Sequence, residues 1–391
     1  MLKFSPPKLS SVIPRPRLLQ RLTQHDDKQL IFILGQAAQG KSTLAASCLE
    51  ELNIKPAWIN LSPEDSDPVN FFHALISALE AAVNSVDFSA IKEYPAFSAG
   101  PRDENALYRD WLQSIFSLVS DPIHIVMDGL DRLAADAASH RFLQKLVEER
   151  PSNVIVWILS RTAASFKLER LKMTQKMVLL DNQELSFSKD EIKIYFKKIK
   201  KMDLDAGQIK KIHQLTEGWV GGLILLSEKL DRLPEASRQK YLLEDMPTFF
   251  KAEVFQYFAE EIFYAQPYSN QRLLIISSVF ESIEPALLNR LADIDSAEQI
   301  FMNLVQRNLF VQLVYDEKKG WVFRYHQLFR DFLRSKFESS PSHDEKNTVL
   351  NRAASLYVRN EEWQNAANFY LEAQNFHEAA AIIERLGADQ L

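Results

Sequence analysis

The chain has 391 residues, of which 46% are hydrophobic and 25% charged, and its formal net charge is −6. Single cores rarely exceed about 250 to 300 residues, so we expect more than one domain. The acidic balance argues against the basic field of a non-specific nucleic-acid binder, and a lone cysteine, Cys48, excludes a disulfide framework and a cysteine-built zinc site.

Short β-branched runs alternate with helical patterns in the first half of the chain. The strands are predicted at residues 30–34, 57–61, 124–128, 153–159 and 176–180. Apolar residues recur at helical spacing in the stretches 69–83 and 104–119 between them. Near-continuous apolar strands separated by helices predict an α/β domain whose parallel sheet is covered on both faces.

The strand signal fades after residue 181. Ser188 followed by Glu191 is a capping box that predicts the start of a helix, and a compact helical segment should run to about residue 233. Residues 235–336 are again mostly helical, but two β-rich runs flank the turn DEKKG in the stretch 309–326. Several helices with one hairpin predict a winged helix.

The last segment, from about residue 344, contains alanine-rich amphipathic helix pairs. They indicate the start of a helical-hairpin array similar to tetratricopeptide repeats (TPR-like). Such arrays need roughly three repeats to bury a continuous face. We therefore expect that the chain is a fragment, or that a sensor arm has been cut away.

The stretch GQAAQGKST, directly after the first predicted strand, has the spacing of a P-loop. In such loops the backbone N–H groups surround phosphates at a helix N-terminus, the lysine reaches the β- and γ-phosphates, and the following hydroxyl holds Mg²⁺. Lys41 and Ser42 take these two roles here. The predicted nucleotide-binding loop comprises Gly35, Gln36, Ala37, Ala38, Gln39, Gly40, Lys41, Ser42 and Thr43.

A nucleotide site of this kind also needs an acid at the end of a neighbouring strand. Asp128 follows the apolar run IHIVM and is the predicted Walker-B acid that holds Mg²⁺ through water; a loop carboxylate capping the next helix is the alternative. Asp131 could orient the attacking water or be an exposed or capping residue. Gly129 stands where many vigorous ATPases place a second carboxylate.

The strand candidate that follows this acid ends in Ser160 and Arg161. In P-loop domains of the additional-strand class, a polar residue at that position lies near the γ-phosphate. Arg161 is therefore predicted to contact the terminal phosphate and report it to the following domain. Pairing with a nearby carboxylate is the alternative.

Seven segments, in this order, resemble the STAND class of signalling ATPases: SVIPRPRLLQRL, GQAAQGKST, IVMDGLD, ILSRT, LSFSKDEI, TEGWVGGLILL and FRYHQLFRDFL. The resemblance is greatest to the large ATP-binding LuxR-type regulators related to the bacterial maltose-regulon activator. It implies a nucleotide-binding P-loop domain at 1–183, with an adenine-side segment at 10–22. A helical domain at 184–234, a winged-helix domain at 235–338 and the start of a TPR-like arm at 339–391 would follow.

The same resemblance assigns further nucleotide contacts. Pro14, Arg15 and Arg17 would lie beside adenine and ribose, or form only a rigid linker. Gly218 and Trp219 would belong to a loop that touches the base, although Val220 replaces the usual proline and Trp219 could be a core residue. His326 would reach the ADP β-phosphate from the winged helix, or be a satisfied structural histidine.

The resemblance implies a regulatory switch in transcription. An ADP-bound closed monomer would convert into an ATP-bound open oligomer when an inducer acts through the missing or truncated sensor arm, with slow ATP hydrolysis and Mg²⁺ as cofactor. A continuously cycling AAA-like or NACHT-like ATPase, or a scaffold with a degenerate nucleotide site, are the alternatives. We expect a cytoplasmic protein with no membrane partner and no DNA contact from these residues.

Overall fold

The computed structural model describes residues 2–10, 12–23, 28–83, 86–92, 103–242, 254–339 and 343–388. These residues form two compact units. The first contains residues 1–213 and 218–224, and the second contains residues 214–217 and 225–391. Among the described residues, none of the helices has the length and apolarity needed to cross a bilayer.

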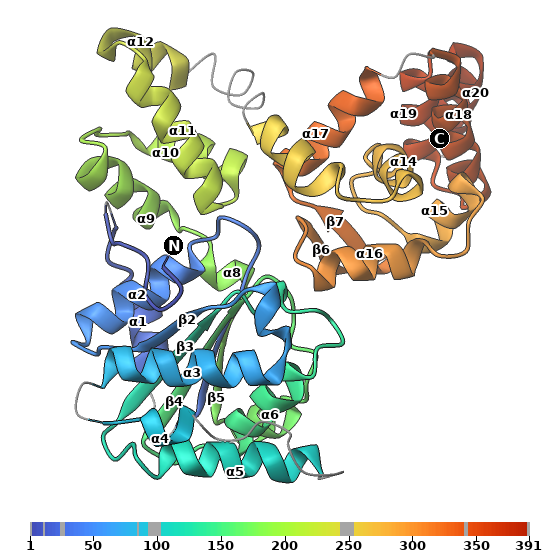
Figure 1. Cartoon of the computed structure of the whole chain (residues 1–391). Coiled ribbons are helices and arrows are strands. Elements are labelled where there is room, and N and C mark those ends of the chain that lie inside the picture. The colour runs from blue at the N-terminus through green and yellow to red at the C-terminus, as the bar shows by residue number, and fades with distance from the viewer. Residues whose placement is uncertain are drawn as a thin grey trace. The chain divides into compact units, whose positions relative to one another are not determined.

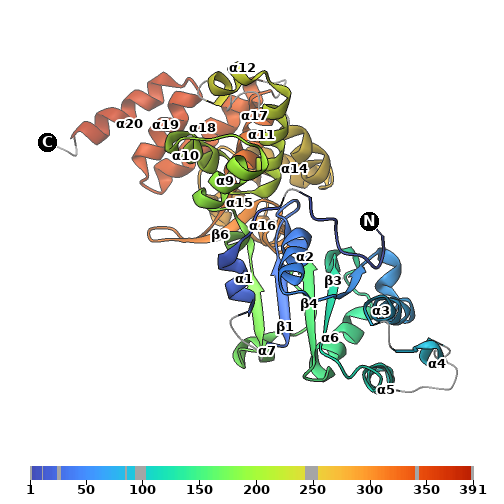
Figure 2. The same cartoon turned by 90° about the vertical axis from the view of Figure 1, so that its left-hand side faces the viewer.

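The first unit is built on a five-stranded sheet in the order β2-β3-β4-β1-β5. All pairings are parallel, as the chain direction of the arrows in Figure 2 shows. The strands are β1 (Leu30–Leu34), β2 (Ala57–Asn60), β3 (Ile123–Asp128), β4 (Val154–Ser160) and β5 (Met177–Leu180). Each lies within one residue of its predicted bounds, which confirms the parallel α/β prediction. Because β4 is inserted between β1 and β3, the additional-strand class is also confirmed.

Helices cover both faces of this sheet. On one face, α3 (Pro68–Ala82), α4 (Ser89–Lys92), α5 (Glu104–Phe116) and α6 (Ser139–Glu149) share a core with alternate residues of β1 to β4. On the other face, α1 (Pro16–Thr23) and α2 (Lys41–Glu51) pack against the intervening residues. Cys48 is buried in this second core, as expected of an apolar helix residue.

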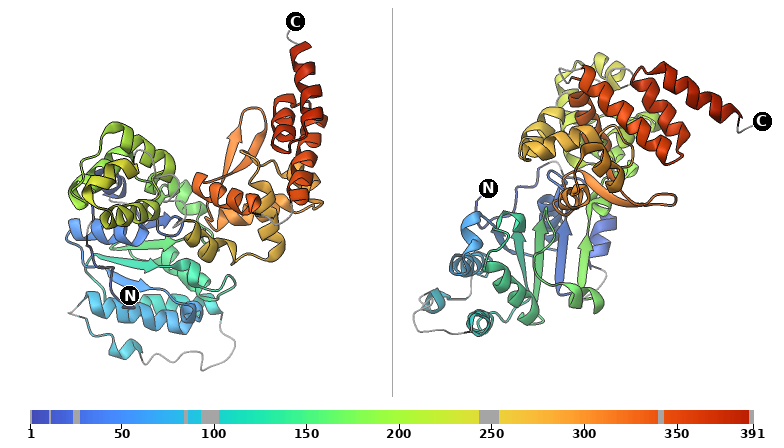
Figure 3. Two further views of the ribbon diagram at one scale, coloured as in Figure 1. Left: turned by 90° about the horizontal axis from the view of Figure 1, so that it is seen from above. Right: turned by 90° about the vertical axis from the view of Figure 1, so that its right-hand side faces the viewer.

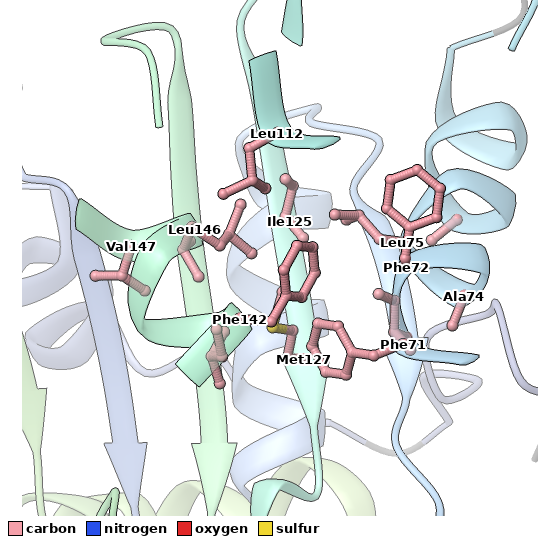
Figure 4. Packing of buried hydrophobic residues seen from close by; sticks show 14 of the residues in the cluster. Phe71, Phe72, Ala74, Leu75, Leu112, Ile125, Met127, Phe142, Leu146 and Val147 are labelled. Carbon is pink, nitrogen blue, oxygen red and sulfur yellow. The ribbon is translucent and has the colours of Figure 1, made fainter. Parts of the chain in front are cut away.

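Aromatic side chains form the centre of the first core. Figure 4 shows Phe71 of α3 and Phe142 of α6 beside Ile125 and Met127 of β3, with Phe72 of α3 farther along the same cluster. The rings of Phe71 and Phe142 are edge to face, with centroids 5.5 Å apart. Burying a side chain of this size contributes about 1.5–3 kcal/mol, so this layer holds β3 and its carboxyl end in place.

Short elements complete the first unit around the sheet. They are η1 (Pro63–Ser66), η2 (Leu130–Arg132), α7 (Glu169–Met173), α8 (Asn182–Leu185), α9 (Lys189–Ile194) and the π-helical turn η3 (Tyr195–Ile199). The capping box is confirmed, because Ser188 Oγ accepts from Glu191 N at 3.2 Å and Glu191 Oε2 accepts from Ser188 N at 2.9 Å. Helices α10 (Ala206–Thr216) and α11 (Val220–Arg232) follow.

The second unit contains the predicted hairpin. Strands β6 (Val311–Asp316) and β7 (Gly320–Tyr325) pair antiparallel, with Val311 opposite Tyr325. The helices are α12 (Glu235–Lys240), the π-helical turn η5 (Ala259–Phe263), α14 (Tyr268–Ser277), α15 (Pro285–Ala292), α16 (Ala297–Gln306) and α17 (Gln327–Glu338). Figure 1 shows α16 beside the hairpin and α17 directly after it, the arrangement of a winged helix. Residues 243–253 of the predicted helical stretch lie outside the described residues.

Three further helices follow in the second unit: α18 (His343–Arg359), α19 (Trp363–Glu372) and α20 (Phe376–Ala388). Each packs on the one before it, and Figure 3 shows the three as adjacent red helices. Ala354, Ala367 and Ala379 are buried between them, since small residues let neighbouring helices approach closely. The repeat array itself and the predicted domain boundaries remain predictions.

Candidate nucleotide site

The loop between β1 and α2 has the backbone shape that a P-loop requires. Ala38 has φ 54° and Gly40 has φ 82°, both in the left-handed region. Gly40 is also the N-cap of α2, and no side chain caps that helix. Turns of this kind gather successive N–H groups into a concave anion site at a helix N-terminus. The loop can therefore receive an anion through its backbone.

Lys41 is the cation of this loop, and its partners in the structure are carbonyl groups. Its Nζ donates to Gly35 O at 2.6 Å and to Gln36 O at 3.0 Å. Burial lowers the pKa of Lys41 to about 8, although Asp131 and Asp128 act in the opposite direction. A half-buried ammonium group that has no direct carboxylate partner among the described residues is costly unless an anion joins it.

The predicted Mg²⁺ ligands lie together at the carboxyl edge of the sheet. Ser42 lies near enough to the carboxylate of Asp128, which ends β3, to affect the pKa of that carboxyl group. Burial raises the pKa of Asp128, while Ser42 and the charge of Lys41 oppose this shift. A hydroxyl and a carboxylate are the hard oxygen donors that Mg²⁺ prefers, so the residues fit the ion. Among the described residues, no group of three or more His, Cys, Asp or Glu side chains is arranged to hold a metal ion.

Asp131 and Arg161 form a pair beside this edge. The Asp131 carboxylate accepts from the backbone N of Arg161 at 2.8 Å, and its second oxygen lies 3.8 Å from Arg161 Nε. The charge of Asp131 raises the pKa of Lys41, and the charge of Arg161 lowers it. The structure thus brings together Lys41, Ser42, Asp128, Asp131 and Arg161, and Arg161 has the carboxylate partner that its alternative interpretation required. The roles of these residues in hydrolysis remain predictions.

The arginines of the segment PRPR have a shared acidic partner. Arg15 Nε and Arg17 Nε both donate to Glu191 Oε1 at 3.0 Å, and each guanidinium also bonds Ser186 O. Burial alone would raise the pKa of Glu191, but the bonds from Arg15 and Arg17 overcome it and lower that pKa. This ion cluster fastens the N-terminal segment to the start of α9. The contacts of Pro14, Arg15 and Arg17 with adenine and ribose stay predictions.

The segment 218–221, at the start of α11, contacts the P-loop directly. Trp219 is 1% exposed and its Nε1 donates to Ala37 O at 3.0 Å. Gly218 has φ 74°, and a Cβ there would lie 2.5 Å from Phe187 O, so only glycine fits. From the opposite flank, Asn182 Oδ1 accepts from Gln36 N at 2.8 Å. Buried Gln39 donates weakly to Ser186 Oγ at 3.3 Å, and half-buried Thr43 follows Ser42 in α2.

His326 lies in the second unit, where both of its ring nitrogens are engaged. Nε2 donates to Thr216 O at 3.1 Å, and Nδ1 accepts from Leu328 N at 3.3 Å as the N-cap of α17. Burial lowers the pKa of His326, so the imidazole is neutral. This is the geometry of a satisfied structural histidine. A phosphate contact would need Nε2 to exchange the Thr216 carbonyl for phosphate, and that role stays a prediction.

The sequence did not reveal three contributors to the site: Asn182, Glu191 as an ion partner, and Gly221, where a Cβ would lie 2.5 Å from Trp219 Cζ2. The sequence predicted Glu191 only as the second residue of a capping box, because that motif does not indicate which distant cations pair with its carboxylate. Asn182 directly follows the strand β5 that flanks β1, and that placement at the carboxyl edge was a usable signal. No local sequence pattern predicted that Gly221 would pack against Trp219.

Comparisons with known proteins agree with this arrangement. Residues 259–345 match the model of the MalT winged helix domain, and residues 10–161 match that of the nephrocystin 3 N-terminal domain. The HTH-type transcriptional regulator MalT of Yersinia pestis (strain Pestoides F) is 26% identical over 340 residues, which cover 85% of this chain and 36% of that protein. MalT of Vibrio parahaemolyticus is 24% identical over 379 residues, covering 96% and 39%.

A crystal structure of a STAND protein with a tetratricopeptide repeat sensor, from Pyrococcus horikoshii, is 18% identical and has a TM-score of 0.45, with 97% of this chain and 51% of that chain covered. The chain spans 36 to 39% of the length of the MalT relatives above. With a P-loop on a parallel sheet, a match to the MalT winged-helix model and MalT relatives aligned along most of its length, the chain is similar to the MalT-like STAND P-loop NTPases.

Proposed function

We propose that this chain is the nucleotide-binding part of a regulatory switch. It binds ADP tightly in a closed monomer, exchanges it for Mg²⁺ and ATP, and then opens and self-associates. The observation that supports this proposal is the half-buried Lys41. Within the part of the chain that the structure describes, its ammonium group hydrogen-bonds carbonyls of its own loop, near Ser42 and Asp128. Such a cation is stabilised when a diphosphate supplies the missing negative charge.

The chain's own residues suffice for binding and orientation. Lys41 and the N–H groups at the start of α2 would hold the phosphates, and Ser42 with Asp128 would hold Mg²⁺. Bound Mg²⁺ would supply charge neutralisation at the phosphates. Arg161, positioned by Asp131, would contact the terminal phosphate. ATP has a γ-phosphate for this contact and ADP does not.

The switch needs such a difference, because a nucleotide shifts two populations only as far as its contacts differ between them. Since the similar MalT proteins carry the name transcriptional regulator, transcription is the process in which we place the output. Slow hydrolysis of ATP to ADP would return the switch to its closed state.

The test is to denature the purified protein and identify any released nucleotide by chromatography, followed by a steady-state ATPase assay. We expect about one ADP per chain and turnover far below about 1 s⁻¹, the lower end of working enzymes. Sustained turnover above that rate would favour a continuously cycling ATPase. A chain that neither carries nor binds adenine nucleotide would favour a scaffold with a degenerate site.

A further inference from the structure

The P-loop contains one backbone position that an L-amino acid rarely adopts. Ala38 has φ 54°, and left-handed backbone costs a residue with a side chain about 1–2 kcal/mol. Such strain persists only where surrounding contacts stabilise it. The contacts around Ala38 therefore decide whether the loop keeps the shape that gathers its N–H groups.

Those contacts come from the segment 218–221 at the start of α11. Trp219 Nε1 donates to the carbonyl of Ala37, the residue directly before Ala38, at 3.0 Å. Gly221 makes room for this ring, since a Cβ at Gly221 would lie 2.5 Å from Trp219 Cζ2 and 2.8 Å from Ala38 Cβ. The packing is therefore close between the indole, Gly221 and the Ala37–Ala38 corner.

A second contact holds the other end of the same loop. Asn182 Oδ1 accepts from Gln36 N at 2.8 Å, and Gly35 is similarly tight, because a Cβ there would lie 2.7 Å from Leu185 Cδ1. Between them, Trp219 and Asn182 each bond a peptide group of the stretch Gln36–Ala37. Both bonds are made to the backbone of the loop, so they act on its shape whichever base is bound.

We infer that Trp219 and Asn182 are positioning residues that hold the P-loop in its phosphate-binding shape, with Trp219 acting through the Ala37 carbonyl. This rests on the proposed nucleotide site and differs from a base contact by Trp219. The two interpretations predict different losses. A base contact weakens adenosine and alters selectivity among bases, whereas a positioning residue weakens every diphosphate and leaves adenosine unchanged.

The experiment compares Trp219→Phe with the wild-type chain by titration calorimetry against ADP, GDP and adenosine. Phenylalanine keeps a buried ring but removes the N–H, which leaves the Ala37 carbonyl without its donor. We expect ADP and GDP to weaken by about tenfold each, as for a lost hydrogen bond that leaves a partner unsatisfied. Their ratio and any adenosine affinity should not change.

The matched control is Trp157→Phe. Trp157 is also 1% exposed, and its Nε1 donates to His124 Nδ1 at 2.9 Å, away from the P-loop. This variant should lose a comparable hydrogen bond in the same unit and keep wild-type ADP affinity. If Trp219→Phe fails to fold, Asn182→Ala, at a half-buried position, carries the test with an expected loss of about fivefold for both diphosphates.

Unchanged ADP affinity in Trp219→Phe, or a changed ADP-to-GDP ratio, would overturn the positioning role while wild-type binding still supports the nucleotide site. Equal losses in Trp157→Phe would also overturn it, because general destabilisation would then explain both variants. A wild-type chain that binds neither diphosphate would instead remove the proposed function itself.

Discussion

Lys41 of the first unit and His326 of the second were both predicted to hold phosphate, yet their surroundings differ. Lys41 is a cation whose ammonium group, among the residues described, hydrogen-bonds carbonyl oxygens of its own loop. His326 is neutral and uses both ring nitrogens within its own unit. The comparison teaches that a half-buried ammonium group bonded to carbonyls points to an anionic ligand, whereas a buried side chain with both polar atoms satisfied is already explained by the fold.

The largest effect should come from removing the charge of Lys41. Lys41→Met keeps the length of the side chain but loses an attraction of about 4 kcal/mol at 4 Å near a protein surface, so ADP should bind about a thousandfold more weakly. Calorimetric titration with ADP measures this. An affinity within a few-fold of wild type would break the comparison, since Lys41 would then be no more a ligand group than His326.

We expect the ion cluster of Arg15, Arg17 and Glu191 to contribute to the free energy of unfolding. Glu191→Ala leaves Arg15, whose side chain is 9% exposed, without its carboxylate and should lower the free energy of unfolding by about 3 kcal/mol. Urea denaturation measures the loss. Arg141→Ala, which breaks an exposed pair with Glu104, is the control and should change stability by less than about 1 kcal/mol.

The pH dependence of ADP binding provides a further test of Lys41 as the phosphate-binding cation. The folded-state pKa of Lys41 is lowered to about 8, so the ammonium form is dominant at pH 7 and scarce at pH 9. Because a phosphate needs the charged form, ADP affinity should fall about tenfold between these values. Calorimetry in buffers of different ionisation enthalpy should also show proton uptake. Lys41→Arg stays charged and should lose this dependence; a wild-type affinity that is flat to pH 9 would contradict it.

The smallest effect should come from His326. His326→Ala removes the N-cap of α17 and the bond to Thr216, and should lower the free energy of unfolding by about 1–2 kcal/mol. If His326 also contributes to the closed state, ADP release should become several-fold faster and ATP-dependent self-association more frequent. Stopped-flow release of fluorescent ADP and light scattering measure these two quantities.

His326→Asn separates the two roles, because asparagine caps helices well but lacks the imidazole. Stability should recover in this variant, while faster ADP release should persist if the imidazole has a role at the phosphate. An unchanged release rate in both variants would leave His326 as a structural residue only.

Much of the architecture follows from local sequence. Strand runs such as LIFIL carry their own signal because a fully buried strand must be apolar along its length, and β1 begins and ends as predicted. The P-loop is equally local, since Gly40 with its φ of 82° and Lys41 at the first turn of α2 are adjacent in the chain. The capping box at Ser188 closes within four residues and needs no distant partner.

The partners of the remaining site residues were decided only by the tertiary structure. Arg15 meets Glu191 across 176 positions, and Trp219 meets Ala37 across 182. A guanidinium or an indole N–H is compatible with any of many acceptors, and 52 acidic residues are available in this chain. Which acceptor lies within reach depends on how the sheet, α8 and the segment 218–221 pack together. That packing is not determined by the residues adjacent in the sequence.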